Sequence, residues 1–162
     1  MKMVCLCGVS GSGKTTWAKE FLKLNPDYAY FNPDEYYAKF NGSELIRDNT
    51  FEVWHAMFRD IHTAGQNGKN VLIDSDNLTV HQRMQWIEWF PEFEHILIYF
   101  YEDFKTCYDR VQKRKRKLSY NQLLSKFHNF ELPSLYYKDS INWKIFQGGC
   151  NNVAQLSEAI KG

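Results

Sequence analysis

Two kinds of hydrophobic pattern alternate along the chain. Short continuous apolar runs, typical of strands buried on both faces, occupy residues 3–7, 28–32, 70–74, 95–101 and 141–146. Apolar residues three or four positions apart predict helices at residues 14–24, 33–40, 51–66, 79–90 and 119–130. A further helix is expected to begin at residue 103 and to reach into the basic run 110–117, and a last one to begin at residue 151 or 152 and end at 160. This alternation predicts a three-layer α/β/α domain with a mainly parallel sheet of about five strands.

Length and charge limit the class of protein. A chain of 162 residues suits one domain, residues 1–162, better than two. The net charge of +1 favours neither nucleic acid nor a membrane surface as a partner, so any electrostatic selectivity must come from local clusters. The apolar start is too short for a signal peptide, and no apolar run reaches the roughly eighteen residues of a transmembrane helix. We therefore expect a cytoplasmic protein without a membrane partner.

Cys5, Cys7 and most of the aromatic residues are expected to be buried in the core. The four cysteines, Cys5, Cys7, Cys107 and Cys150, form no C-x-x-C pair and suit a reducing compartment. Aromatic residues make up 17% of the chain, and their helical spacing favours packing over ligand contact. The spaced groups are Trp17, Phe21 and Leu24; Trp54, Met57, Phe58 and Ile61; and Trp86, Trp89 and Phe90. We predict the last two groups as core rather than as a platform for stacking bases.

Three glycines surround one lysine directly after the first predicted strand. Residues 8–15, GVSGSGKT, match the phosphate-binding pattern G-x-x-x-x-G-K-[ST] in full, between a strand and a helix. Backbone N–H groups can wrap a phosphate chain where Cβ atoms are absent, and a helix N-terminus adds donors and partial positive charge. We predict that this P-loop binds ATP or another nucleoside triphosphate, with Lys14 on the β- and γ-phosphates and Thr15 on Mg²⁺. The predicted contacts are Gly8, Ser10, Gly11, Ser12, Gly13, Lys14, Thr15 and Thr16.

Acidic residues follow the second and third predicted strands, at the sheet edge where the P-loop lies. Asp34 could take a proton from an attacking hydroxyl as a general base, or only stabilise the start of a helix; we favour the base. Asp74 ends the third strand, where P-loop enzymes place a metal-supporting carboxylate, and Asp76 is a competitor two residues on. Asn77 suits a turn as well as it suits substrate contact.

A basic run of six cations in eight residues spans positions 110–117. Such a run is usually a solvated helical face, and it could also contact a nucleic-acid backbone. Its place after the fourth strand favours a mobile lid whose arginines close on the transferring phosphoryl group. Arg110 and Arg114 are four residues apart, so we predict that they share a helical face and perform this role. The five histidines are scattered without the spacing of zinc ligands.

The segment 8–37, with its P-loop followed by WAKEF and NPDEYY, resembles the opening of phage-type polynucleotide 5′-hydroxyl kinases. The segment 71–86, VLIDSDNLTVHQRMQW, and the arginine-bearing region ahead of LP are also similar. The resemblance implies a kinase-like fold of the P-loop NTPase superfamily, with a helical lid at about residues 108–133. It also implies that Lys14 and Thr15 bind phosphates and Mg²⁺, that Asp34 is the general base, and that Arg110 and Arg114 act from the lid.

The same resemblance raises questions about the acceptor. The family carries an arginine, which grips a phosphate of the nucleic acid, at the position of Tyr37. A tyrosine there could instead stack on a base or ring. Arg83 lies on the helix that carries an arginine in the family, and is expected near substrate together with Asp76. Either Asp74 or Asp76 could match the family's acidic residue, and we favour Asp74 because it directly ends the strand.

We therefore expect an ATP- and Mg²⁺-dependent kinase that transfers the γ-phosphoryl group to a hydroxyl, most simply the 5′-OH of a DNA or RNA end. One alternative keeps the chemistry and changes the acceptor to a nucleoside, a modified base in DNA or another small molecule. A second alternative is a switch module that binds or hydrolyses a nucleoside triphosphate and acts through a partner.

Overall fold

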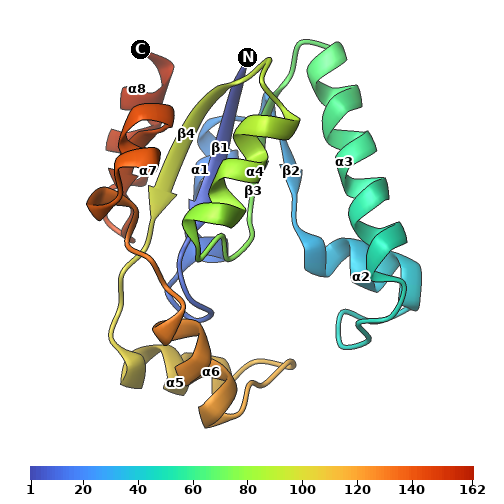
Figure 1. Ribbon diagram of the computed structural model, residues 1–162, viewed down its shortest axis with the longest axis vertical. Coiled ribbons are helices and arrows are strands. Elements are labelled where there is room, and N and C mark those ends of the chain that lie inside the picture. The colour runs from blue at the N-terminus through green and yellow to red at the C-terminus, as the bar shows by residue number, and fades with distance from the viewer.

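The chain folds into a twisted parallel sheet between two layers of helices in the computed structural model, which describes residues 1–162 (Figure 1). The five strands are β1 (Lys2–Cys7), β2 (Tyr28–Phe31), β3 (Asn70–Ile73), β4 (Glu94–Tyr99) and β5 (Lys144–Gln147). All neighbouring strands pair in parallel, in the order β2-β3-β1-β4-β5. This arrangement confirms the predicted three-layer α/β fold.

Eight α-helices and one short 3-10 helix connect and cover the strands. They are α1 (Lys14–Leu24), α2 (Pro33–Asn41), α3 (Thr50–Gln66), α4 (Val80–Trp89), α5 (Phe104–Gln112), α6 (Tyr120–His128), η1 (Pro133–Leu135), α7 (Tyr137–Asn142) and α8 (Val153–Lys161). Side chains that cap helix starts fix several boundaries: Thr79 and Ser119 each form a reciprocal capping box with a glutamine three residues on. None of these helices has the length and apolar character needed to span a lipid bilayer.

Alternate side chains of β1 belong to two different cores, as expected for a strand buried on both faces. Met3, Cys5 and Cys7 pack with residues of α3 and α4 on one face of the sheet. Val4 and Leu6 pack with residues of α1 and α8 on the other face. Cys5 and Cys7 are free and buried, in agreement with the prediction; Cys107 is also free and buried, whereas Cys150 is exposed.

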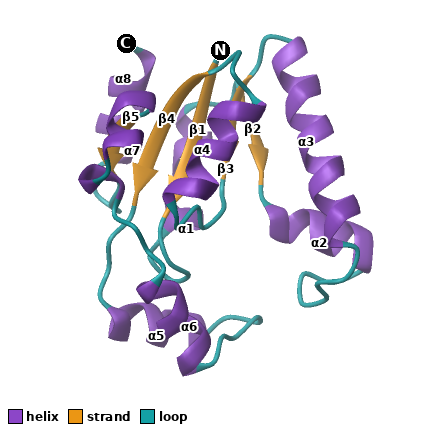
Figure 2. Ribbon diagram, viewed as in Figure 1, coloured by secondary structure: helices purple, strands orange, loops and turns teal.

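Helices α5 and α6 form a separate lobe beyond the ends of the strands (Figure 2). A small apolar cluster that includes Cys107, Val111 and Leu123 holds these two helices together and joins them to the P-loop residue Val9. The arrowheads of β1, β2 and β4 point toward the side of the molecule that carries this lobe and α2. The lobe occupies the position predicted for a lid, at the carboxyl edge of the sheet.

One predicted boundary and one predicted burial are wrong. The strand predicted at residues 141–146 begins only at Lys144, because the preceding residues form α7 and only Trp143 turns into the core. Helix α5 begins after its cap Asp103 and ends at Gln112, inside the basic run, as predicted. Leu24, predicted on the buried stripe of α1, is 50% exposed at the end of that helix.

Candidate active site

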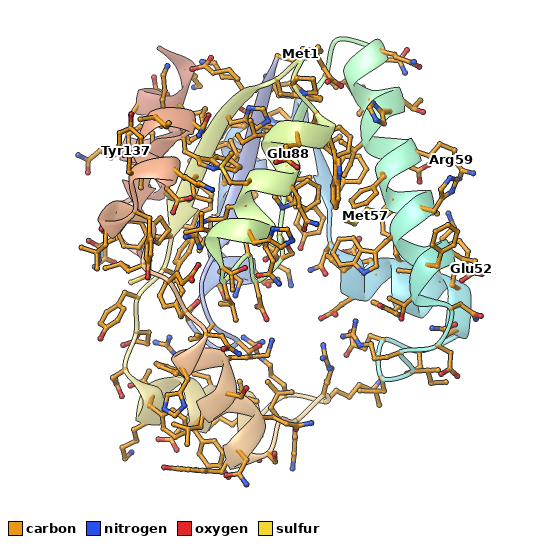
Figure 3. The ribbon with its side chains drawn as sticks, in the orientation of Figure 1. Met1, Glu52, Met57, Arg59, Glu88 and Tyr137 are labelled. Atoms are coloured by element: carbon orange, nitrogen blue, oxygen red, sulfur yellow. The ribbon has the colours of Figure 1, made fainter.

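One large cleft lies at the carboxyl edge of the sheet, between the P-loop, α2, the ends of β2 and β3, and the lid. Its volume is about 1030 Å³, at the upper end of the range for small-molecule sites and enough for two substrates. Figure 3 shows side chains of the lid and of the α2–α3 region pointing into the space below the sheet. The predicted site residues that line the cleft are Ser10, Gly11, Gly13, Lys14, Thr15, Thr16, Asp34, Tyr37, Asp74, Asp76, Asn77 and Arg114. The predicted residues Gly8, Ser12, Arg83 and Arg110 do not line it.

The P-loop backbone adopts conformations that require glycine. Gly11 has φ of 91°, and a Cβ atom there would lie 2.6 Å from the carbonyl oxygen of Cys107. Gly13 has φ of 107° and stands at the N-cap of α1, where no side chain caps the helix. The first N–H groups of α1 are therefore open toward the cleft, which makes this helix start suited to an anion such as phosphate.

Lys14 connects the P-loop to the end of β3. Its Nζ donates to the carbonyl oxygens of Gly8 at 2.6 Å and Val9 at 3.0 Å, and to Oδ1 of Asp76 at 3.0 Å. The other oxygen of Asp76 accepts from Lys126 of α6. Burial alone would raise the pKa of Asp76, but the two ammonium groups outweigh it and hold this pKa well below its usual range.

Asp34 lies across the cleft from the P-loop, at the start of α2. Asn32 caps this helix by accepting from the Asp34 backbone N–H at 2.8 Å, and Pro33 occupies the first helical position. The Asp34 side chain is 43% exposed and faces two guanidinium groups. Arg47 of the α2–α3 connection and Arg116 of the lid both donate to its Oδ1, Arg116 at 3.2 Å.

Tyr37 and Arg47 form one unit beside Asp34. The Tyr37 ring is 6% exposed, and its hydroxyl group lies 3.2 Å from Thr50 Oγ1. The guanidinium carbon of Arg47 lies 4.3 Å from the centre of the Tyr37 ring, in the range of a cation–π contact. The Tyr37 ring thus packs against Arg47, an arginine that the sequence analysis did not identify. Through Arg47, a positive charge lies next to Asp34 although position 37 itself is a tyrosine.

A comparison with known protein families identifies the family of this chain. Residues 3–132 match the model of the AAA_33 family, described as an AAA domain. The chain belongs to the AAA_33 family. Because the match covers the P-loop, Asp34, both β3 carboxylates and the lid, the whole cleft lies within the AAA_33 domain.

Solved structures share the fold at low sequence identity. A gluconokinase from Sinorhizobium meliloti 1021 matches with a TM-score of 0.64 and 15% identity, over 99% of this chain and 95% of its own. A chain of the Pnkp1/Rnl/Hen1 RNA repair complex matches with a TM-score of 0.66 and 19% identity, over 80% of this chain and 46% of its own. Chaetomium thermophilum Kti12 in complex with ADP-AlF3 matches with a TM-score of 0.66 and 15% identity, over 99% of this chain and 97% of its own. These likenesses show that the AAA_33 domain has a P-loop kinase-like fold.

The two lid arginines predicted for this AAA_33 domain have different surroundings. Arg110 donates to the carbonyl oxygen of Gly11 at 3.0 Å and pairs with Glu102 at 3.2 Å, outside the cleft. Arg114 lines the cleft, but it lies beyond the end of α5. The prediction that they share a helical face is therefore wrong. Arg116, which the sequence did not single out, is the lid arginine that contacts Asp34.

Arg83 and Asn77 have structural partners instead of open surface. Both Arg83 and Asp139 of α7 are 0% exposed, and two Arg83 nitrogens donate to the two carboxylate oxygens of Asp139 at 2.9 and 2.7 Å. The prediction that Arg83 contacts substrate is wrong because its guanidinium is buried in this pair. Asn77 lines the cleft at φ 47°, but its amide donates to Leu6 and accepts from Trp86, so the turn role prevails.

The acidic residues of the AAA_33 domain present oxygen atoms near the P-loop. Asp74 is buried, and its Oδ2 accepts from Tyr30 at 2.8 Å and from Asn32 at 3.3 Å. No group of three or more His, Cys, Asp or Glu side chains forms a ready metal cage. Mg²⁺ is commonly held by only one or two carboxylates together with substrate phosphates, so the hydroxyl of Thr15 and the carboxylates of Asp74 and Asp76 fit this ion.

Proposed function

We propose that this AAA_33 domain is an ATP-dependent phosphotransferase whose acceptor is the 5′-hydroxyl of a nucleic-acid end. The observation that carries the proposal is the position of Asp34. It faces the P-loop across one cleft and stands between two guanidinium groups. A carboxylate on the acceptor side of the transferring phosphoryl group can take the proton of the attacking hydroxyl, whereas a hydrolytic switch has no need of an acceptor-side base.

The protein's own groups would supply positioning and charge. The N–H groups of the P-loop and of the first turn of α1 hold the phosphates, and Lys14 moves from its backbone partners to the β- and γ-phosphate oxygens. Thr15, with Asp74 or Asp76, would hold Mg²⁺, which neutralises phosphate charge when bound. Arg114 and Arg116 reach the same space from the lid and stabilise the charge of the transferring group.

Charge around the cleft supports an anionic acceptor. Seven of its lining residues are Lys or Arg and five are Asp or Glu, a formal excess of two positive charges in a chain whose net charge is +1. These cations are Lys14, Lys19, Arg47, Arg114, Lys115, Arg116 and Lys126. Two polyanions, a nucleoside triphosphate and a nucleic-acid end, would use this excess better than a neutral sugar.

A second candidate is phosphorylation of a small-molecule hydroxyl. This chain covers 95% of the gluconokinase but only 46% of the chain from the RNA repair complex. The size of the domain thus corresponds to that of a kinase for a small acceptor, and Tyr37 stands where the polynucleotide kinases carry arginine.

One labelling experiment separates these functions. The protein is incubated with γ-labelled ATP and a panel of 5′-hydroxyl oligonucleotides, nucleosides and sugars, and the labelled product is identified. Label at oligonucleotide 5′ ends supports the proposal, and label only in a small molecule supports the second candidate. Label found only in inorganic phosphate supports a hydrolytic switch and contradicts both.

Asp34→Asn tests the general base directly. Because asparagine keeps the size of the side chain but cannot take the proton, we expect ATP affinity close to that of the wild type and a turnover lowered by about 100-fold or more. Asp48→Asn is the matched control, since Asp48 is exposed on the α2–α3 connection and lies outside the cleft. Turnover that is equal in Asp34→Asn and wild type would remove Asp34 from the mechanism.

A further inference from the structure

A wall of aromatic rings borders the cleft on the side of Asp34. Trp54 and Phe58 of α3 and Trp86 and Trp89 of α4 all line it. The Phe58 ring centre lies 4.8 Å from that of Trp89, 5.7 Å from that of Trp54 and 5.7 Å from that of Trp86. These residues therefore form one continuous aromatic surface between two helices, which we call the aromatic wall.

The aromatic wall is not explained by core packing alone. Met57, Ile61 and Phe90, from the same two helical stripes, are fully buried against the sheet. Figure 3 shows Met57 on the side of α3 that faces α4, with Glu52 and Arg59 on the outer side. Trp89, by contrast, is 41% exposed, and Trp54 and Phe58 are half-buried. The prediction of core packing is confirmed for Met57, Ile61, Trp86 and Phe90. Trp54 and Phe58 pack against the same core while remaining partly open, and Trp89 is the residue for which the prediction is wrong.

The chemistry of the aromatic wall selects a flat ring. Its polar neighbours on α4 are the amides of Gln82 and Gln85, and Gln82 already accepts from the backbone of Thr79 in a capping box. A polyol would leave several hydroxyl groups without partners against this surface, which is costly on desolvation. A heteroaromatic base can stack on indole and phenyl rings and direct its few polar edge atoms to an amide such as that of Gln85.

The location of the aromatic wall separates it from the donor nucleotide's phosphates. Helix α1, whose start would hold those phosphates, packs on one face of the sheet, and α3 and α4 pack on the opposite face. Asp34, Arg47 and the aromatic wall line the same cleft. A ligand with a hydroxyl at Asp34, an anionic group at Arg47 and a flat ring on the aromatic wall would use all three features.

Building on the proposed function, we propose that the aromatic wall binds the terminal nucleobase of the acceptor by stacking and so selects a base-bearing 5′-hydroxyl end. Trp54 and Trp89 are the specificity-determining residues in this subsite. Stacking tolerates any base, so the subsite requires a base to be present but does not read sequence.

The test is an equilibrium binding measurement that does not depend on phosphoryl transfer. Two trinucleotides with a 5′-hydroxyl and a fluorophore at the 3′ end are titrated by anisotropy with ADP present; one has a normal 5′-terminal base, and the other is abasic at that residue. The wild type should bind the base-bearing probe about 5- to 150-fold more tightly. Trp89→Leu and Trp54→Leu should lose most of this preference while binding the abasic probe and ADP as the wild type does.

Phe51→Leu is the matched control, because Phe51 is an aromatic residue of α3 that is 77% exposed and lies outside the cleft. It should keep the full preference. The proposal would be overturned if the wild type bound the two probes equally or bound neither of them. It would also be overturned if both tryptophan variants kept the preference for the base-bearing probe. Melting curves establish that each variant is folded, and the wild-type comparison decides the question if the variants do not fold.

Transfer of label from ATP, measured on the same two probes, separates the two proposals. Base-dependent binding without any transfer would leave the subsite standing and refute the kinase function. Transfer with equal kcat/KM to both ends would leave the kinase function standing and refute the subsite.

Discussion

Replacing Asp139 with asparagine leaves the buried guanidinium of Arg83 without its counter-charge. Arg83 on α4 and Asp139 on α7 are both 0% exposed and share two short hydrogen bonds, so solvent cannot take over the role of the carboxylate. In Asp139→Asn, one oxygen acceptor remains, but the new NH₂ group opposes an N–H donor of Arg83. The variant therefore keeps a buried positive charge and adds a donor–donor conflict.

The size of the effect follows from this burial. Removing one partner of a buried ion pair costs about 3–5 kcal/mol, a large part of the roughly 5–15 kcal/mol by which a domain is stable. For a chain of this length, the melting temperature should fall by about 6–20 °C. Arg83 also donates to the carbonyl oxygens of Asn77 at 3.0 Å and Leu78 at 2.9 Å, so its displacement would disturb the connection that carries Asp76.

Urea and thermal unfolding followed by tryptophan fluorescence measure this loss. Asp109→Asn is the matched control, because it makes the same chemical change in the solvent-exposed pair of Lys105 and Asp109 and should leave unfolding unchanged within error. The double variant Arg83→Met/Asp139→Leu leaves no unpaired buried charge. Its loss in free energy of unfolding should therefore be smaller than the sum of the losses in Arg83→Met and Asp139→Leu by about 2 kcal/mol or more. A loss below about 1 kcal/mol for Asp139→Asn would refute the reasoning.

Two further predictions concern the P-loop and the cysteines. Gly11→Ala should lower both the melting temperature and the nucleotide affinity more than Gly42→Ala does. Both positions have positive φ, but only at Gly11 would the added Cβ clash with the Cys107 carbonyl oxygen. Equal losses in the two variants, measured by thermal melting and by titration with ADP, would contradict this. Burial raises the pKa of the Cys7 thiol to about 12 and that of Cys107 to about 11, so both stay protonated at pH 8. Iodoacetamide at that pH should therefore modify only the exposed Cys150 in the folded protein, as counted by mass spectrometry, and a rapid second adduct would show that a buried thiol is accessible.

The parts of the fold that could be predicted are those in which burial leaves a pattern. Strand β1 is buried on both faces and reads as an unbroken apolar run, and the P-loop combines a strand end, glycines and a helix start in one short motif. Strand β5 lies at the sheet edge with exposed Lys144 and Gln147, so its pattern is weak. Helix α7 is only six residues long and depends on the distant partner of Asp139, which local sequence does not reveal.

The site residues that could be predicted are likewise those that a local sequence pattern marks. Lys14, Asp34 and Asp76 follow strands or stand in a motif, and the structure brings them into one cleft. Arg47 was missed because it lies in an irregular connection and meets Asp34 only after α2 has turned. Lys126 lies 50 residues from Asp76, its partner in the folded chain, and no spacing rule links them.

The aromatic wall shows that helical spacing alone does not predict which residues of a stripe are buried in the core. Helical spacing shows that Trp54 and Trp89 share stripes with core residues, but a stripe can continue beyond the edge of a sheet. Only the relative position of α3 and α4 decides which rings leave the core and border the cleft.

The apolar cluster anchors the base of the lid to Val9, and charged and polar contacts link the rest of the lid to the opposite side of the cleft and to the P-loop. Arg116 meets Asp34, Lys126 meets Asp76 and Arg110 meets a P-loop carbonyl, and all these side chains are partly open to water. Dissolved ions screen such contacts between charged groups, whereas they do not screen the apolar cluster that joins the lid to Val9. Lid opening should therefore become faster as ionic strength rises. If product escape limits turnover, added salt would raise the maximal rate even as it weakens the capture of anionic substrates.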